Sequence, residues 1–164
     1  MKTLYVVRHA KSSWDQDDLI DFDRPLNERG IKNAPEMAKR LINRSAIPQL
    51  ILSSPANRAI STARIFANEM SISEDKIKQE SSIYEGTRGD LARLISRQNP
   101  DFDILMLTGH NPGVTDFINW ICYCEEAQIP TCSIATIQVD SKKWNGWERG
   151  MGKLIELDFP KKKK

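Results

Sequence analysis

The stretch "LYVVRHAKSSWD", residues 4–15, decides the fold of this chain. Its first four residues are apolar and rich in β-branched and aromatic side chains, a composition typical of a buried strand. The apolar run stops at Arg8 and His9, two neighbouring side chains that can both carry charge. Packing alone gives no reason for a buried strand to end in this pair, and a negatively charged ligand at the strand end would.

Outward from this stretch, segments of strand length alternate with segments of helical period. Apolar residues that recur every three or four positions predict amphipathic helices, and short apolar runs between turn residues predict strands. Asn27 is the expected cap of the first helix, and Ser54 is the expected cap of the second, with Pro55 at its first helical position. Predicted strands cover 3–8, 50–53, 77–84, 103–109, 133–140 and 153–159, and predicted helices cover 27–44, 54–70, a short segment opened by Gly89-Asp90 and a segment from Asn111-Pro112 onward.

The alternation of strands and helices predicts the α/β class, with a mostly parallel central sheet and helices on both faces in a three-layer αβα sandwich. The last two strands flank a turn rich in Trp and Gly, which predicts an antiparallel hairpin at one edge of the sheet. We expect a single domain over 1–160, followed by a short basic tail over 161–164.

Composition sets broad limits on function. The chain has 164 residues, of which 40% are hydrophobic and 28% charged, as in ordinary globular proteins. No apolar stretch approaches the roughly 18 residues that span a bilayer, and Arg8 interrupts the first apolar run before it could serve as a secretory signal. A net charge of +2 is too small to indicate a nucleic-acid partner. We therefore expect a soluble cytoplasmic protein that binds neither nucleic acid nor membrane.

The three cysteines, Cys122, Cys124 and Cys132, are an odd number and lack a nearby histidine. This pattern favours buried thiols over a disulfide framework or a zinc site.

The two histidines of the chain, His9 and His110, each follow a predicted strand. Arg8 precedes the first of them, and Arg58 lies one turn into the helix after the strand 50–53. Each of these residues alone would more often be structural or solvated. Because ligands of open α/β sheets bind beyond the carboxyl ends of the strands, the four together predict an anion site at that edge, next to helix N-termini.

This residue set suits phosphoryl chemistry. Two guanidiniums can each direct two N–H donors at phosphate oxygens. A neutral imidazole is a good nucleophile toward phosphorus when a hydrogen bond holds its other ring nitrogen, and a second, protonated imidazole can stabilise the developing charge. Phosphoryl transfer depends mostly on positioning and charge stabilisation, so we expect no metal and no cofactor.

Three segments resemble the motifs of one known family. "VVRHAKSSWD" (6–15), "LILSSPANRAISTA" (50–63) and "LMLTGHNPG" (105–113) are similar, in order and spacing, to the three motifs of the histidine phosphatase superfamily, which has the phosphoglycerate mutase-like fold. The short chain, "DFDRPLNERG" (21–30) and the Asn-Pro after His110 resemble the SixA-like phosphohistidine phosphatases most. The resemblance implies that His9 becomes phosphorylated and is then hydrolysed, and that Arg8, Arg58 and His110 bind the phosphoryl group.

Some residues depart from the family pattern or leave a role open. Ala10 replaces the glycine of the first motif, and Asp15 stands where many relatives have an asparagine, so we leave Asp15 out of the binding set. Glu85 is the best-placed candidate for a general acid, and a solvated glutamate is the alternative. Arg24 can either turn toward the pocket or remain outside it.

The aspartates between 15 and 23 fail the calcium-loop pattern and favour a solvated acidic loop, which could select a basic protein partner. Short connections between Arg58, Glu85 and His110 predict an open pocket without a lid. We therefore expect a metal-independent phosphatase that acts on phosphohistidine in a signalling or phosphotransfer protein. The alternatives are a broad phosphomonoesterase or mutase for small phosphoesters, and a non-catalytic module that binds a phosphorylated ligand.

Overall fold

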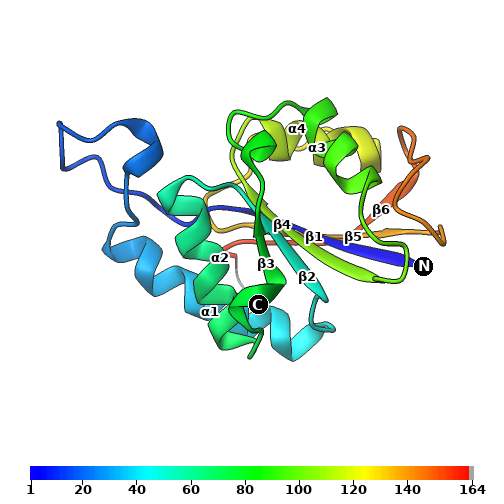
Figure 1. Ribbon diagram of the computed structural model, residues 1–164, viewed down its shortest axis with the longest axis horizontal. Helices are drawn as coiled ribbons and strands as arrows, with labels where there is room; N and C mark the ends of the chain where they lie inside the picture. Colours follow the sequence, from blue (N-terminus) through cyan, green and yellow to red (C-terminus); the bar gives the residue numbers. More distant parts are fainter. Residues whose placement is uncertain (163–164) are drawn as a thin grey trace.

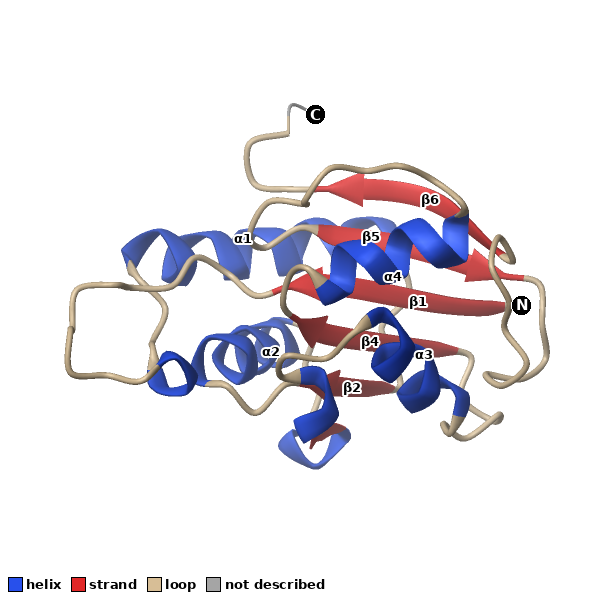
Figure 2. Cartoon of the chain, turned by 90° about the horizontal axis from the view of Figure 1, so that it is seen from above, coloured by secondary structure: helices blue, strands red, loops and turns tan. Residues whose placement is uncertain are grey.

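A mixed six-stranded sheet forms the centre of the part of the chain that the computed structural model describes, residues 1–162. The strand order across the sheet is β3-β2-β4-β1-β5-β6 (Figures 1 and 2). The strands are β1 (Lys2–Arg8), β2 (Leu50–Ser53), β3 (Ile77–Gln79), β4 (Ile104–Gly109), β5 (Ile134–Val139) and β6 (Gly152–Asp158). The first four strands are parallel, whereas β5 runs antiparallel to β1 and β6 antiparallel to β5. This arrangement confirms the predicted antiparallel edge.

The register of the three central parallel strands brings their carboxyl ends level. Arg8 of β1 pairs with Gly109 of β4, and Ser53 of β2 pairs with Thr108 of the same strand. The residues that follow these strands therefore enter one edge of the sheet together.

Two helices cover each face of the sheet, so the predicted three-layer α/β sandwich is confirmed (Figure 2). One face carries α1 (Glu28–Arg44) and α2 (Asn57–Glu69), and the other carries α3 (Arg88–Ser96) and α4 (Gly113–Cys122). Three short 3-10 turns complete the fold: η1 (Asp21–Asp23), η2 (Glu74–Lys76) and η3 (Ser81–Ile83).

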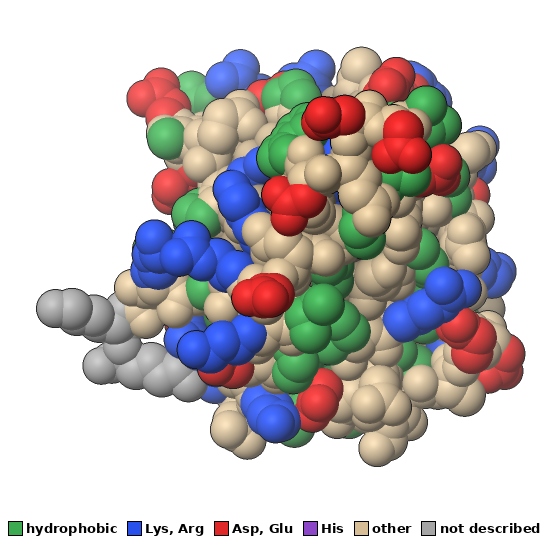
Figure 3. Space-filling view, turned by 90° about the vertical axis from the view of Figure 1, so that its left-hand side faces the viewer, with side chains coloured by type: hydrophobic (Ala, Val, Ile, Leu, Met, Phe, Trp, Pro, Cys, Tyr) green, Lys and Arg blue, Asp and Glu red, His purple; other side chains and the backbone are tan. Residues whose placement is uncertain are grey.

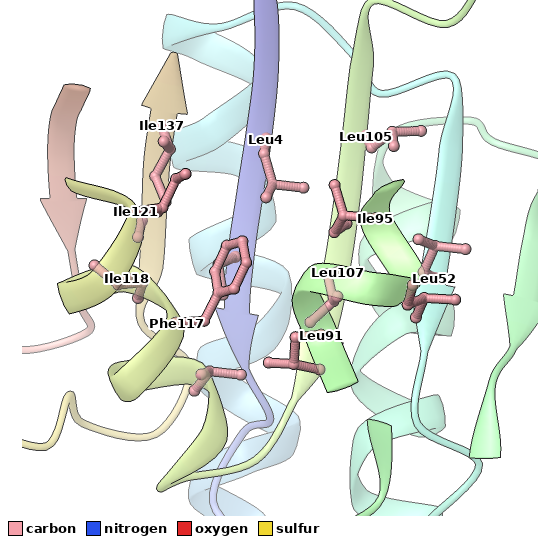
Figure 4. Close-up of a cluster of buried hydrophobic side chains, with 14 of the residues drawn as sticks. Leu4, Leu52, Leu91, Ile95, Leu105, Leu107, Phe117, Ile118, Ile121 and Ile137 are labelled. Atoms are coloured by element: carbon pink, nitrogen blue, oxygen red, sulfur yellow. The ribbon is translucent and has the colours of Figure 1, made fainter. Parts of the chain in front are cut away.

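Alternation along β1 supplies both halves of the core. Leu4 and Val6 pack with α3 and α4, whereas Tyr5 and Val7 pack with α1 and α2. Figure 4 shows the first cluster, in which Phe117 of α4 lies beside Leu4. Because the central strands are buried on both faces, they appear in the sequence as continuous apolar runs. Burial of each large apolar side chain contributes about 1.5–3 kcal/mol.

Helix starts follow the predictions in part. Asn27 caps α1, and its side chain accepts a hydrogen bond from the Gly30 N–H at 2.9 Å, as expected. The prediction for α2 was wrong, because the helix begins at Asn57 with Ala56 as its cap. The fully buried side chain of Ser54 instead lies against His110.

The predicted strand 77–84 was also wrong in its extent. β3 ends at Gln79 and is followed by η3, which carries the chain toward the strand ends of the sheet. β3 is an edge strand that pairs with β2 alone, through three residues, so no second ladder holds residues 80–84 extended. Tyr84 and Glu85 are thereby brought to the carboxyl edge.

The three cysteines are free thiols. Cys132 is buried and the other two are half-buried, and burial raises the pKa of Cys122 and of Cys132 to about 12. Within residues 1–162, no helix has the length and apolar character needed to span a membrane. The predicted basic tail lies partly outside the described residues, at 163–164.

Candidate active site

The sequence-predicted histidines and arginines converge at the carboxyl edge of the parallel strands. Arg8 is the last residue of β1, and His9 and His110 directly follow β1 and β4. Arg58 is the second residue of α2. The centroids of the two imidazole rings lie 5.1 Å apart. Figure 3 views this edge of the molecule, where acidic and basic side chains are interspersed at the surface.

A pocket of about 370 Å³ opens at this edge. Arg58 and His110 line it, whereas His9 is only 6% exposed and lies against His110. The remaining lining residues come from the η1 turn, the 84–87 turn and the start of α4: Asp21, Tyr84, Glu85, Gly86, Thr87, Asn111, Pro112, Gly113 and Asp116.

The imidazole of His9 has one defined tautomer. Its Nδ1 lies 2.7 Å from the Ala10 carbonyl oxygen, and because a carbonyl can only accept, Nδ1 carries the proton. The lone pair is therefore on Nε2. Burial, together with the neighbouring His110, Arg58 and Arg8, lowers the pKa of His9 to about 3, so the ring is neutral at pH 7. A neutral imidazole with a free Nε2 is the form required of a nucleophile.

The imidazole of His110 is held through its Nε2 atom. Its Nε2 lies 2.8 Å from Ser54 Oγ, which itself accepts the Ala56 N–H at 3.2 Å. Among the described residues His110 Nε2 is the one acceptor within reach of this buried hydroxyl, so the hydroxyl donates to Nε2 and the proton of His110 is on Nδ1. Burial and, after it, the charge of Arg58 together lower the pKa of His110 to about 4. In the ligand-free site His110 is therefore neutral and offers Nδ1–H as a donor, and the protonated form stays a prediction for the site with a phosphoryl group bound.

Both arginines are held by hydrogen bonds from their terminal Nη atoms. Arg8 Nη1 donates to the Ile129 carbonyl at 2.8 Å. Arg58 donates from Nη1 to the Asp21 carbonyl at 2.8 Å and from Nη2 to Asp21 Oδ2 at 2.9 Å. The Nε atoms of both guanidiniums are buried and have no hydrogen-bond partner among the described residues.

These unpaired donors are the most informative feature of the site. Within residues 1–162, four buried side-chain atoms lack a partner: Arg8 Nε, Arg58 Nε, His110 Nδ1 and Thr108 Oγ1. A buried polar group without a partner costs about 1–3 kcal/mol, so native proteins seldom leave three at one place without a function. The first three belong to side chains that sequence analysis assigned to a phosphoryl site, and their chemistry suits an oxyanion.

Two pocket residues were missed by sequence analysis. Asp21 Oδ2 accepts hydrogen bonds from Arg58 and from the Tyr84 hydroxyl, the latter at 2.8 Å. Arg24 Nε lies 3.2 Å from Asp21 Oδ1, and the Arg24 guanidinium stacks on Trp14. Asp21 is exposed, as expected for a solvated acidic loop, but its carboxylate also pairs with Arg58, and Arg24 turns inward to support it. The sequence signal was weak, because Asp21 is one of several aspartates and Tyr84 lies in a segment predicted as strand.

The remaining candidates are less tied to the pocket. Glu85 lines it with an exposed side chain and a left-handed backbone, φ +57°. Asp15 is exposed and does not line the pocket. The methyl group of Ala10 is fully buried, and the Ala10 N–H donates to Thr62 Oγ1 at 3.0 Å, so the fold accommodates this departure from the family motif. The described residues contain no cluster of three or more His, Cys, Asp or Glu that could hold a metal ion.

Comparisons with known proteins agree with this geometry. Residues 4–102 match the histidine phosphatase superfamily (branch 1). An uncharacterized chloroplast protein of Arabidopsis thaliana is 31% identical over 151 residues, which cover 87% of this chain and 69% of that protein.

Several solved structures share the fold. A candidate phosphohistidine phosphatase SixA of Agrobacterium tumefaciens superposes with a TM-score of 0.81 at 27% identity, over 97% of this chain and 98% of that one. The protein histidine phosphatase SixA in complex with tungstate gives a TM-score of 0.82 at 20% identity, over 96% and 97% of the two chains. A phosphoserine phosphatase variant of Entamoeba histolytica gives 0.70 at 16% identity, over 98% of each chain, and this likeness concerns the fold alone. The chain is therefore a SixA-like member of the histidine phosphatase superfamily, branch 1.

Proposed function

We propose that this phosphatase works through a phosphohistidine intermediate on His9 and that its substrate is a phosphohistidine in another protein. Membership of the superfamily supports the general activity. The observation that carries the proposed intermediate is the set of buried, unpaired donors Arg8 Nε, Arg58 Nε and His110 Nδ1 beside a neutral His9.

In the first step, the Nε2 lone pair of His9 attacks phosphorus and forms a P–N bond while the bond to the leaving group breaks. The leaving group takes the bonding electron pair. Arg8, Arg58 and His110 donate hydrogen bonds to the phosphoryl oxygens, where charge is spread in the transition state. The proton held on His9 Nδ1 by the Ala10 carbonyl lets the ring carry the positive charge that develops.

In the second step, water attacks phosphorus from the side that the leaving group vacated. The bond from phosphorus to His9 Nε2 breaks, the imidazole regains its lone pair, and the water proton passes to solvent or to a pocket carboxylate. Inorganic phosphate is then released from the same donors. No step needs a metal ion.

The leaving-group side of the pocket supports a phosphohistidine substrate. Glu85 lines the pocket but is exposed, and its carboxylate makes no hydrogen bond with a described residue. An alkoxide needs a well-held acid to leave, whereas a histidine imidazole is a better leaving group and depends on such an acid much less. We therefore assign Glu85 an assisting role, and a small-phosphoester activity would be slow by comparison.

Trapping the intermediate tests this proposal. A phosphorylated histidine-containing protein, labelled on phosphorus, should transfer an acid-labile, base-stable label to the wild-type enzyme and none to the His9→Ala variant. The His110→Asn variant is the matched control, because it should still take the label at a reduced rate.

Absence of label with every phosphodonor tried would contradict the proposal and favour a binding module. A kcat/KM on p-nitrophenyl phosphate that equals the value on the phosphoprotein would instead favour a broad phosphomonoesterase. EDTA should leave the rate unchanged, and a strong loss of activity would contradict the metal-free steps.

A further inference from the structure

The charges that line the pocket are unevenly distributed. Three carboxylates, those of Asp21, Glu85 and Asp116, line it together with a single cationic side chain, Arg58. No lysine and no second arginine is among the described lining residues. A substrate group beyond the phosphoryl group would therefore meet carboxylates and neutral groups.

The guanidinium of Arg58 has little capacity left for a second anion. Of its five N–H donors, one on Nη1 and one on Nη2 are directed at the carbonyl and the carboxylate of Asp21. Three donors remain, the buried Nε and the second hydrogens of Nη1 and Nη2, and of these Nε and Nη2 form the pair on one edge of the guanidinium that can bind two phosphoryl oxygens. Hence a carboxylate on the leaving group would find no free cation in the pocket.

Asp21 is held as a carboxylate by three neighbours. Burial acts to raise its pKa, but the hydrogen bonds from Tyr84 and Arg58 and the charges of Arg58 and Arg24 outweigh this effect and keep the pKa below its ordinary value. Burial and the adjacent Asp21 raise the pKa of Tyr84, so its hydroxyl keeps the proton that it donates to Asp21. The negative charge at this wall is therefore permanent near pH 7.

We propose that the pocket accepts phosphoryl donors with a neutral or cationic leaving group, rejects those with an anionic one, and that Asp21 is the residue that sets this specificity. This inference rests on the proposed function and narrows its substrate class. A histidine imidazole meets the requirement, as does any phosphorylated side chain within a basic segment. Phosphoesters of hydroxy acids do not.

The expected size of the effect follows from Coulomb's law. A single unit charge about 6 Å from another, at effective dielectric constants between about 20 and 80, changes a binding constant by about three- to a hundredfold, and comparing a cation with an anion at that place squares this factor to about tenfold or more. Because the Asp21 side chain is 47% exposed and is paired with Arg58 and Arg24, we expect discrimination at the lower end of this range, about tenfold.

Two small monoesters of similar size and opposite charge provide the test. Phosphoethanolamine carries an ammonium group and phosphoglycolate carries a carboxylate at the same distance from phosphorus. Their dissociation constants are measured by calorimetry on the His9→Ala variant, in which the esters remain intact. Phosphoethanolamine should bind about tenfold more tightly than phosphoglycolate.

The Asp21→Asn change in the same background should reduce this preference to about threefold or less, because the amide oxygen can still accept from Arg58 while the charge is lost. Asp23→Asn is the matched control. Asp23 lies in the same η1 turn, is exposed, and its carboxylate makes no hydrogen bond with a described residue. This variant should keep the full preference.

Equal affinity for the two esters, or a preference that survives Asp21→Asn, would overturn the inference and leave the proposed function standing. Inorganic phosphate serves as the separate probe of the phosphoryl site. If neither phosphate nor either ester binds, the anion site itself is refuted, and the proposed function falls together with the inference.

Discussion

The hydrogen bond between Ser54 and His110 gives the sharpest test of how the pocket is organised. In the Ser54→Ala variant, His110 Nε2 loses its partner at 2.8 Å, and its proton is no longer held on Nδ1. A neutral hydrogen bond contributes about 0.5–1.5 kcal/mol, and a buried group left unpaired costs about 1–3 kcal/mol. If about 1–2 kcal/mol of this loss appears in the transition state, kcat/KM falls by about 5- to 30-fold.

Ser53→Ala is the matched control for this change. Ser53 is equally buried and one residue away, but its hydroxyl donates to the Ser54 carbonyl at 2.9 Å and not to a histidine. Both variants should lose similar stability in urea unfolding, while only Ser54→Ala should lose kcat/KM on a phosphorylated histidine substrate. If the two variants had kcat/KM values within twofold of each other, the assigned role of Ser54 in orienting His110 would be refuted.

Three further predictions concern the pocket and its pH dependence. The Arg58→Lys variant should lose about 2–4 kcal/mol of transition-state stabilisation, measured as a fall in kcat/KM, because an ammonium group cannot replace the Nε and Nη2 donors. Activity within a few-fold of wild type would contradict this. The free energy of unfolding should fall as pH drops below 6.5, since both histidines are neutral in the folded protein, with pKa values of about 3 and 4, but take up protons when unfolded. The loss at pH 5 is about 2 kcal/mol per histidine, and a His9→Asn/His110→Asn variant should show a flatter profile in urea titrations. The Glu85→Gly variant should have a free energy of unfolding about 0.5–1 kcal/mol higher than wild type, because glycine adopts the left-handed backbone without strain. It should also retain most phosphohistidine turnover. A loss as complete as that of His9→Ala would make Glu85 indispensable.

The sequence was sufficient for the sheet apart from the length of β3, and for the location of four side chains of the candidate site. Arg8, His9 and His110 were predictable because each directly follows or ends an apolar run of strand length, and parallel strands bring such positions to one edge. Arg58 was predictable because the helix that carries it begins a few residues after β2. The local patterns and the tertiary arrangement agree at these positions.

The supporting residues could not be predicted in the same way. Asp21 reaches Arg58 because the loop after β1 folds back through a bridge between Ser12 and Leu26, a pairing with no local signature. Tyr84 reaches Asp21 because β3 stops after three residues, and its short length depends on its place at the edge of the sheet. Ser54 matched a helix cap by residue type, and only the packing of α2 against β4 assigns its side chain to His110. These contacts link residues distant in the chain, so sequence pattern alone does not contain them.

A crystal structure with bound tungstate tests most directly whether the four side chains enclose one tetrahedral anion. We predict tungsten next to His9 Nε2, with oxygens accepting from Arg8 Nε, Arg58 Nε and His110 Nδ1, and with Asp21 still bound to the outer edge of Arg58. Tungstate bound elsewhere, or held by Arg58 with His9 turned away, would contradict the account.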